Sequence, residues 1–152
     1  MIINLTKNKI IAKKTLFAVS FTARGRGMIG RTFEDFDAMV FNRCNSIHTM
    51  LMGMKIDVLF VNSENSICEI RKELLPWKPF IRCSKAVTVI ELPCGTIDRT
   101  GTEIGDILNL NAEVTQDTEQ KLEQHLLPTP EAVISINSPS VNIEKDRVFR
   151  KT

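Results

Sequence analysis

The sequence lacks a long apolar run. Near the N-terminus the longest one is TLFAVSF at residues 15–21, and no segment approaches the roughly 20 residues of a membrane span. The same stretch is too short for most signal-peptide cores, and the residues after it, TARGR at 22–26, offer a poor cleavage site. We therefore expect no membrane span and a cytoplasmic location.

A strong charge of either sign is also absent. The 152 residues include 20 Lys and Arg against 18 Asp and Glu, a formal net charge of +2. This imbalance is too small to require a nucleic-acid or acidic-lipid partner. The hydrophobic content of 43% and the charged content of 25% are ordinary for a globular protein of one domain. We expect no nucleic-acid partner, and the ligand or protein partner stays open.

Cysteines at zinc-ligand spacing are missing as well. The four cysteines, Cys44, Cys68, Cys83 and Cys94, are widely spread and contain no CxxC pair. Only Cys44 and His48 come near the spacing of a zinc knuckle. Without a secretory signal, reduced thiols are the favoured state. The sequence therefore predicts neither a metal site nor a cofactor.

One glycine-rich segment, ARGRGMIGR at 23–31, matches neither common phosphate-binding loop. No Gly-Lys-Ser/Thr follows it, and no βαβ unit with a later acidic residue surrounds it. We expect Thr22 to cap a short helix that carries Arg24, Arg26 and Arg31 and is interrupted by glycines. The arginines could bind an anion, but solvated arginines around a turn are the favoured interpretation.

Most of the chain has the pattern of strands and turns. The segment VNSENS at 61–66 has hairpin chemistry between two apolar runs, and Trp77 falls in a loop between two prolines. A short helical turn ending at Gly101 precedes a last strand at 107–110. We predict a β-rich α+β fold, a small antiparallel meander or partly closed barrel with one or two short helices. The other expected strands are 13–20, 37–44, 45–61, 67–74 and 85–92.

The character of the chain changes near Asn111. Residues 1–110 are expected to form a single β-rich globular domain. Residues 111–152 are expected to be a C-terminal extension, with a short helix at about 118–127 and a partly irregular tail beyond it. Leu122, Leu126 and Leu127 share one face of that helix.

A row of sulfur-containing residues raises the question of a soft-metal site. His48, Met50, Met52 and Met54 alternate in a segment that we expect to be a strand, which would place them on one face for Cu(I). Methionine is also a flexible filler of apolar cores. Core packing is the favoured interpretation of this row.

Two polar residues beside the apolar strand are the leading site candidates. Asp57 lies between Ile56 and Val58, and His48 precedes the methionine row. If buried, they need partners such as each other, Thr49 or Arg24. A satisfied polar network is the favoured interpretation, and Asp57 is the first candidate for a ligand-binding role, with His48 second.

Five separated motifs resemble domain-of-unknown-function family 192, whose biochemical role is unassigned. They are ARGRGMIGR, CNSIHTMLMGMKIDVLFVN, LPWK, IELPCGT and GTEIGDIL, in the family's order over about residues 14–110. Within the second motif, Met50 and Met54 stand where relatives carry aromatics, and Lys55 stands where they carry proline. The residues that match there are Cys44, His48, Thr49, Met52, Ile56, Asp57 and Val58. The resemblance implies a small β-rich domain with short helices.

Three functional hypotheses follow, and the sequence assigns none of them. The leading one is a non-enzymatic binding or accessory module for a small polar ligand or a peptide. Its expected ligand-binding residues are Arg24, His48, Thr49, Asp57 and Trp77. The second is a hydrolase-like enzyme that uses Cys44 or His48 with Asp57. The third is a protein-interaction module that uses the C-terminal extension.

Overall fold

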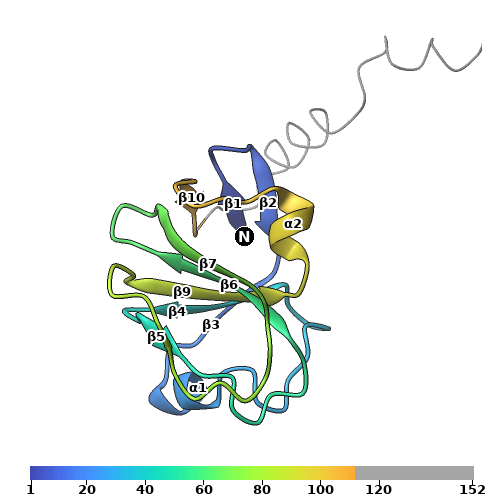
Figure 1. The fold of residues 1–152 in the computed structure, drawn as a ribbon. Helices are drawn as coiled ribbons and strands as arrows, with labels where there is room; N and C mark the ends of the chain where they lie inside the picture. Colours follow the sequence, from blue (N-terminus) through green and yellow to red (C-terminus); the bar gives the residue numbers. More distant parts are fainter. Residues whose placement is uncertain (112–152) are drawn as a thin grey trace, which may run out of the picture.

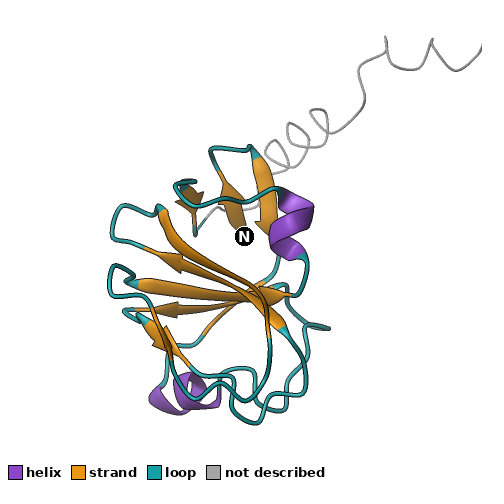
Figure 2. Cartoon of the chain, viewed as in Figure 1, coloured by secondary structure: helices purple, strands orange, loops and turns teal. Residues whose placement is uncertain are grey.

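Three β-sheets and two short helices make up the computed structural model, which describes residues 1–111 (Figure 1, Figure 2). The predicted β-rich fold is confirmed, and the sheets of the described part do not close into a barrel. No helix within residues 1–111 is long and apolar enough to cross a membrane. The predicted helix at about 118–127 and the rest of the C-terminal extension lie outside the described residues.

A mixed five-stranded sheet forms the centre of the fold. Its spatial order is β3-β4-β9-β6-β7, and β3 and β4 are its parallel pair. The order does not follow the sequence because β9 lies between β4 and β6 and pairs with both. The strands are β3 (Thr15–Phe17), β4 (Ala38–Asn42), β6 (Ile56–Val61), β7 (Ile67–Leu74) and β9 (Thr88–Pro93). Every residue of β6 is buried, as expected for a strand covered on both faces.

The hairpin between β6 and β7 forms as predicted. Oδ1 of Asn62 accepts hydrogen bonds from the backbone N–H groups of Glu64 and Ser66, at 3.0 and 2.9 Å. Asn65 adopts a positive φ of 58°, which asparagine tolerates better than most residues. The turn chemistry read from the sequence is therefore the chemistry that closes this hairpin.

One face of the central sheet is covered by the two chain ends of the described region. β1 (Ile2–Asn4), β2 (Lys9–Ala12) and β10 (Leu108–Asn109) form a three-stranded sheet, and α2 (Thr96–Thr100) lies beside it (Figure 1). Buried Ile2, Leu59 and Leu92 belong to the core cluster on this side. The β1–β2 hairpin was missed in the sequence, although isoleucine pairs flank a mostly polar segment at residues 4–9.

The opposite face is covered by α1 (Phe21–Arg26) and by the small sheet of β5 (Ser46–Ile47) and β8 (Ile81–Arg82). The predicted short helix is present, but its N-cap is Ser20, whose Oγ accepts from the N–H of Ala23 at 3.1 Å. Thr22 lies inside the helix, and the helix ends before Arg31. A second core cluster, which includes Met39, Phe60 and Val89, fills the space between these elements and the central sheet.

The methionine row is not a strand, and that prediction was wrong. β5 ends at Ile47, residues 48–55 form an irregular loop, and Leu51 has a φ of 60°. Met52 is buried in the second core cluster, whereas Met50 and Met54 are only partly covered. Because a loop does not alternate side chains as a strand does, the argument for three thioethers on one face no longer applies.

Candidate functional site

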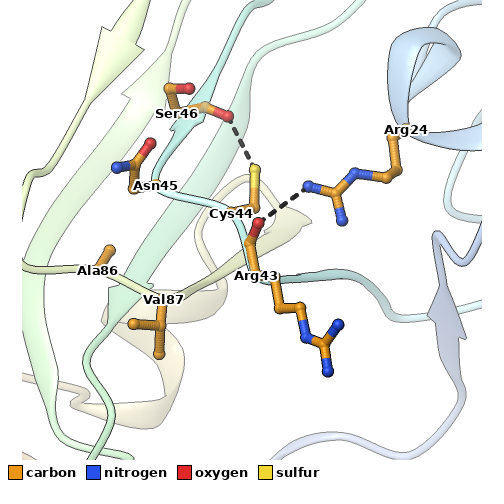
Figure 3. Close-up of a pocket in the computed structure, with 7 residues that line it drawn as sticks. All are labelled: Arg24, Arg43, Cys44, Asn45, Ser46, Ala86 and Val87. Atoms are coloured by element: carbon orange, nitrogen blue, oxygen red, sulfur yellow. Dashed lines mark hydrogen bonds between the residues drawn. The ribbon is translucent and has the colours of Figure 1, made fainter. Parts of the chain in front are cut away.

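A pocket of about 390 Å³ opens between α1 and the loop that joins β4 to β5 (Figure 3). Its volume falls in the range of small-ligand sites. Among the described residues, two arginines and no carboxylate contribute to its walls. The lining residues are Arg24, Arg43, Cys44, Asn45, Ser46, Ala86 and Val87.

Arg24 holds the pocket loop against α1. Its Nη1 donates to the carbonyl oxygen of Asn42 at 2.6 Å, and its Nη2 donates to that of Arg43 at 3.2 Å. A guanidinium has five N–H donors, so these two bonds leave three more. Figure 3 shows the Arg24 side chain reaching from the helix to the loop. Arg24 therefore both shapes the pocket and keeps donors for a ligand.

Arg43 lies at the exposed rim of the same pocket. Its backbone has a φ of 52°, a conformation that few residues other than glycine adopt. In Figure 3 its side chain extends away from Ser46 and forms no hydrogen bond with the residues drawn. The guanidinium is therefore a cation that a ligand can reach.

Cys44 contributes a thiol to the pocket wall. Its Sγ donates to the carbonyl oxygen of Ser46 at 3.0 Å, and its backbone N–H donates to that of Val87 at 2.9 Å. In the described part of the chain no hydrogen bond joins this thiol to His48 or to Asp57. Within residues 1–111, neither His48 nor Asp57 is therefore hydrogen-bonded to Cys44 as a base, which the enzyme hypothesis requires.

Asp57 is buried and bonded to backbone amides. Its side chain lies on the α2 side of the central sheet, where Oδ1 accepts from the N–H of Glu73 at 2.9 Å and Oδ2 accepts from that of Ile97 at 3.0 Å. The residue is only 1% exposed. Both oxygens thus connect α2 and β7 to β6, and the predicted ligand-binding role of Asp57 stays a prediction.

Thr49 and Trp77 meet in a second place. The hydroxyl of Thr49 donates to the carbonyl oxygen of Leu75 at 2.8 Å and accepts from the N–H of Lys78 at 3.0 Å. The N–H of Trp77 donates to the carbonyl oxygen of Thr49 at 2.8 Å, and the indole side chain is largely exposed. Thr49 thus fixes the loop that follows β7.

His48 lies in the chain between the pocket residue Ser46 and Thr49. Its Nδ1 is buried and has no hydrogen-bond partner among residues 1–111. The predicted site residues are therefore spread over three regions. Arg24 lines the pocket, Thr49 and Trp77 share the loop contacts, and Asp57 supports α2. His48 is two positions beyond the pocket residue Ser46.

Sequence reasoning missed Glu91, a buried carboxyl in the middle of β9. Its Oε2 has no hydrogen-bond partner within the described residues, and the residue is 2% exposed. Burial raises the pKa of Glu91 to about 8. The sequence did contain a signal for a buried carboxyl here, because Glu91 stands between Ile90 and Leu92 as Asp57 stands between Ile56 and Val58.

Groups of three or more His, Cys, Asp or Glu side chains that could hold a metal do not occur within residues 1–111. The pocket of two arginines and the mixed sheet covered on both faces define a small β-rich domain with a basic, ligand-sized hollow.

The chain belongs to the DUF192 family, described as "Uncharacterized ACR", whose model matches residues 3–110. This confirms the resemblance read from the motifs. The match begins within β1, at residue 3, so the family's domain includes nearly all of the β1–β2 hairpin that the motifs did not cover.

Two archaeal relatives are similar over most of their length. A UPF0127 protein of Thermococcus sibiricus is 32% identical over 136 residues, which cover 86% of this chain and 82% of the relative. A UPF0127 protein of Pyrococcus furiosus is 32% identical over 113 residues, which cover 72% of this chain and 97% of the relative.

Two crystal structures share the fold. A protein of unknown function from Novosphingobium aromaticivorans has a TM-score of 0.57 and 20% identity, covering 62% of this chain and 73% of its own. A protein from Sinorhizobium meliloti, titled as a candidate transcription regulator, has a TM-score of 0.57 and 25% identity, covering 62% of this chain and 79% of its own.

Proposed function

We propose that this protein is a small binding module whose pocket beside Arg24 and Arg43 takes a small anionic ligand. The observation that carries the proposal is the presence of two arginines, and of no carboxylate, among the described residues that line a ligand-sized hollow. Arginine donates in a planar fork that matches carboxylate and phosphate oxygens.

The hydrogen bonds of Arg24 support this proposal by preparing the pocket before a ligand arrives. Because Arg24 already bonds the carbonyl oxygens of Asn42 and Arg43, the loop needs little further ordering when the ligand binds. A site that is largely formed in advance loses less conformational entropy on binding.

The rest of the lining supports selectivity for a small ligand. Asn45 and Ser46 add amide and hydroxyl groups that can bond polar atoms, and Ala86 and Val87 add apolar surface. Ligand pockets commonly combine such apolar walls with a few polar groups that orient the ligand. The class we propose is a phosphate- or carboxylate-bearing metabolite.

The first experiment identifies the ligand. Native mass spectrometry of the full chain, purified directly from its host, is expected to show a retained anionic small molecule. Isothermal titration calorimetry then measures the affinity for two probes, inorganic phosphate and citrate. Binding to at least one probe is expected to weaken as the salt concentration rises, because the arginines are partly exposed.

Matched variants decide whether the pocket is the site. Arg43→Gln is expected to weaken probe binding roughly 10- to 100-fold, the effect of losing one charge-assisted hydrogen bond. Arg99→Gln removes an exposed arginine from α2, on the other side of the sheet, and is expected to leave the affinity unchanged. Equal losses in both variants, or no binding of either probe by the wild type, would contradict the proposal.

A further inference from the structure

Two of the four cysteines lie against each other. The Sγ atoms of Cys68 and Cys83 are 3.5 Å apart, although 15 positions separate the residues in sequence. Cys68 is in β7, and Cys83 follows β8 immediately. The two thiols therefore face each other from different elements, within hydrogen-bond distance.

An irregularity in β7 aims Cys68 at its partner. The β6–β7 register pairs Val61 with Ile67 and Phe60 with Glu69, so Cys68 is the extra residue of a bulge. Bulges of this kind redirect a side chain away from the regular strand alternation. The Sγ of Cys68 also donates to the carbonyl oxygen of Phe60 at 3.3 Å.

Cys83 is held in place from both sides. Its backbone N–H donates to the carbonyl oxygen of Asn45 at 2.9 Å, and its own carbonyl oxygen accepts from the N–H of Ala86 at 3.1 Å. Cys83 is buried, with 6% exposure, whereas Cys68 is partly exposed. A reagent in solvent therefore reaches Cys68 first.

We propose that Cys68 and Cys83 are a redox-active thiol pair that closes to an intramolecular disulfide when it meets a low-molecular-weight disulfide such as oxidised glutathione. The sulfurs must approach by roughly 1.5 Å to reach the 2.03–2.05 Å of an S–S bond. Small rotations of both side chains supply that movement. This inference does not rest on the anion-binding proposal.

The exchange takes two steps. The Cys68 thiolate attacks one sulfur of oxidised glutathione, which forms a mixed disulfide and releases one glutathione thiolate. The Cys83 thiolate then attacks Sγ of Cys68 and releases the second glutathione. Together the steps oxidise two protein thiols by two electrons, and the two protons go to the two glutathione molecules formed.

The remaining cysteines are held elsewhere. Cys44 donates to the carbonyl oxygen of Ser46, and the Sγ of Cys94 lies 3.7 Å from Oε1 of Glu73. Specific pairing of Cys68 with Cys83 is therefore expected.

Burial, and after it the hydrogen bond to Cys83, raises the pKa of Cys68 to about 11. Oxidation should therefore be slow at pH 7 and accelerate about tenfold per pH unit up to pH 9, as the thiolate fraction rises.

The test uses the full chain in buffers of defined reduced and oxidised glutathione. After unreacted thiols are blocked, digestion without reductant is expected to yield the Cys68–Cys83 cross-linked peptide, and reductant is expected to remove it. Cys94→Ser is the matched control and should form the same cross-link. Cys83→Ser should instead carry one glutathione on Cys68.

Thermal unfolding adds an independent measurement. Closing a loop of this length is expected to raise Tm by on the order of 10 °C in the oxidised wild type, and to change nothing in Cys83→Ser. A wild type without the cross-linked peptide under oxidising buffers, or with other cysteine pairs predominating, would overturn the proposal. A cross-link that lowered Tm would also overturn it, because the pair would then not be preformed.

Discussion

Glu91 is a buried carboxyl group in β9, and its ionisation should oppose folding. Its pKa rises from the ordinary 4.5 to about 8 because burial disfavours the charged form. Between these two values the folded state binds more protons than the unfolded state. The contribution of Glu91 to stability is therefore fully present below about pH 4.5 and is lost as pH rises toward 8, by roughly one kcal/mol per pH unit.

The variant Glu91→Gln isolates this effect, because glutamine has nearly the shape of the protonated acid and does not ionise. We expect the difference in unfolding free energy between variant and wild type to move in favour of the variant as pH rises from 5 to 8. Urea unfolding at pH 5, 6, 7 and 8 measures it. A difference that stays constant over this range would show that Glu91 does not titrate there.

Two buried acids on neighbouring strands show how far a single residue's neighbours decide its chemistry. Asp57 and Glu91 each interrupt an apolar strand, and they face opposite sides of the central sheet. Asp57 meets two backbone N–H groups, whereas Oε2 of Glu91 meets no donor among the described residues. Sequence context treats the two alike, but the structure gives them different environments.

At the scale of elements, Asp57 ties a helix and a strand to the centre of the sheet. It bonds the first turn of α2 through Ile97 and the end of β7 through Glu73, where the backbone has a φ of 50°. We expect Asp57→Ala to lower the free energy of unfolding by roughly 3 kcal/mol, since the backbone N–H groups of Glu73 and Ile97 lose a charged acceptor. Chemical denaturation of the purified variant measures the loss.

Asp98 provides the matched control on the same helix. Its carboxylate is exposed and pairs with Lys72, and exposed ion pairs contribute little to stability. Asp98→Ala is therefore expected to unfold close to the wild type. If both variants lost the same stability, the hydrogen bonds of Asp57 would not be the reason for the effect. Weaker hydrogen-exchange protection of the Ile97 amide in Asp57→Ala would locate the change at α2.

At the scale of the whole molecule, the two core clusters divide the fold into layers. One fills the space between the central sheet and the β1-β2-β10 sheet, and the other fills the space toward α1 and β5. Within the described residues, the members of both clusters run from residue 2 to residue 110, and the family match spans 3–110. We propose on these grounds that residues 1–111 fold as a unit.

Deleting residues 112–152 tests this unit directly. The truncated chain is expected to unfold cooperatively, with a Tm within about 5 °C of the full chain, which corresponds to about 1 kcal/mol. Differential scanning calorimetry of both proteins makes the comparison. A broad transition, or aggregation of the truncated chain at low temperature, would show that the extension is needed for the fold.

Local structure could be predicted from the sequence wherever residues close together in the chain supply the interaction. The β6–β7 hairpin depends on the Asn62 side chain and the turn residues beside it. The end of α2 depends on Gly101, which takes a φ of 63°. The strand predicted through the methionine row failed because alternating sulfur side chains suit a loop that packs one methionine into the core as well as they suit a strand.

The sequence by itself determined the β-rich class, the family, the hairpin turn and the glycine-ended helical turn, because these depend on residues close together in the chain. Only the tertiary structure decided which face Asp57 and Glu91 occupy, since side-chain burial depends on the register between distant strands. It also brought Arg24 beside Cys44 and Cys68 beside Cys83. Those contacts join residues far apart in sequence, and the packing of the elements creates them.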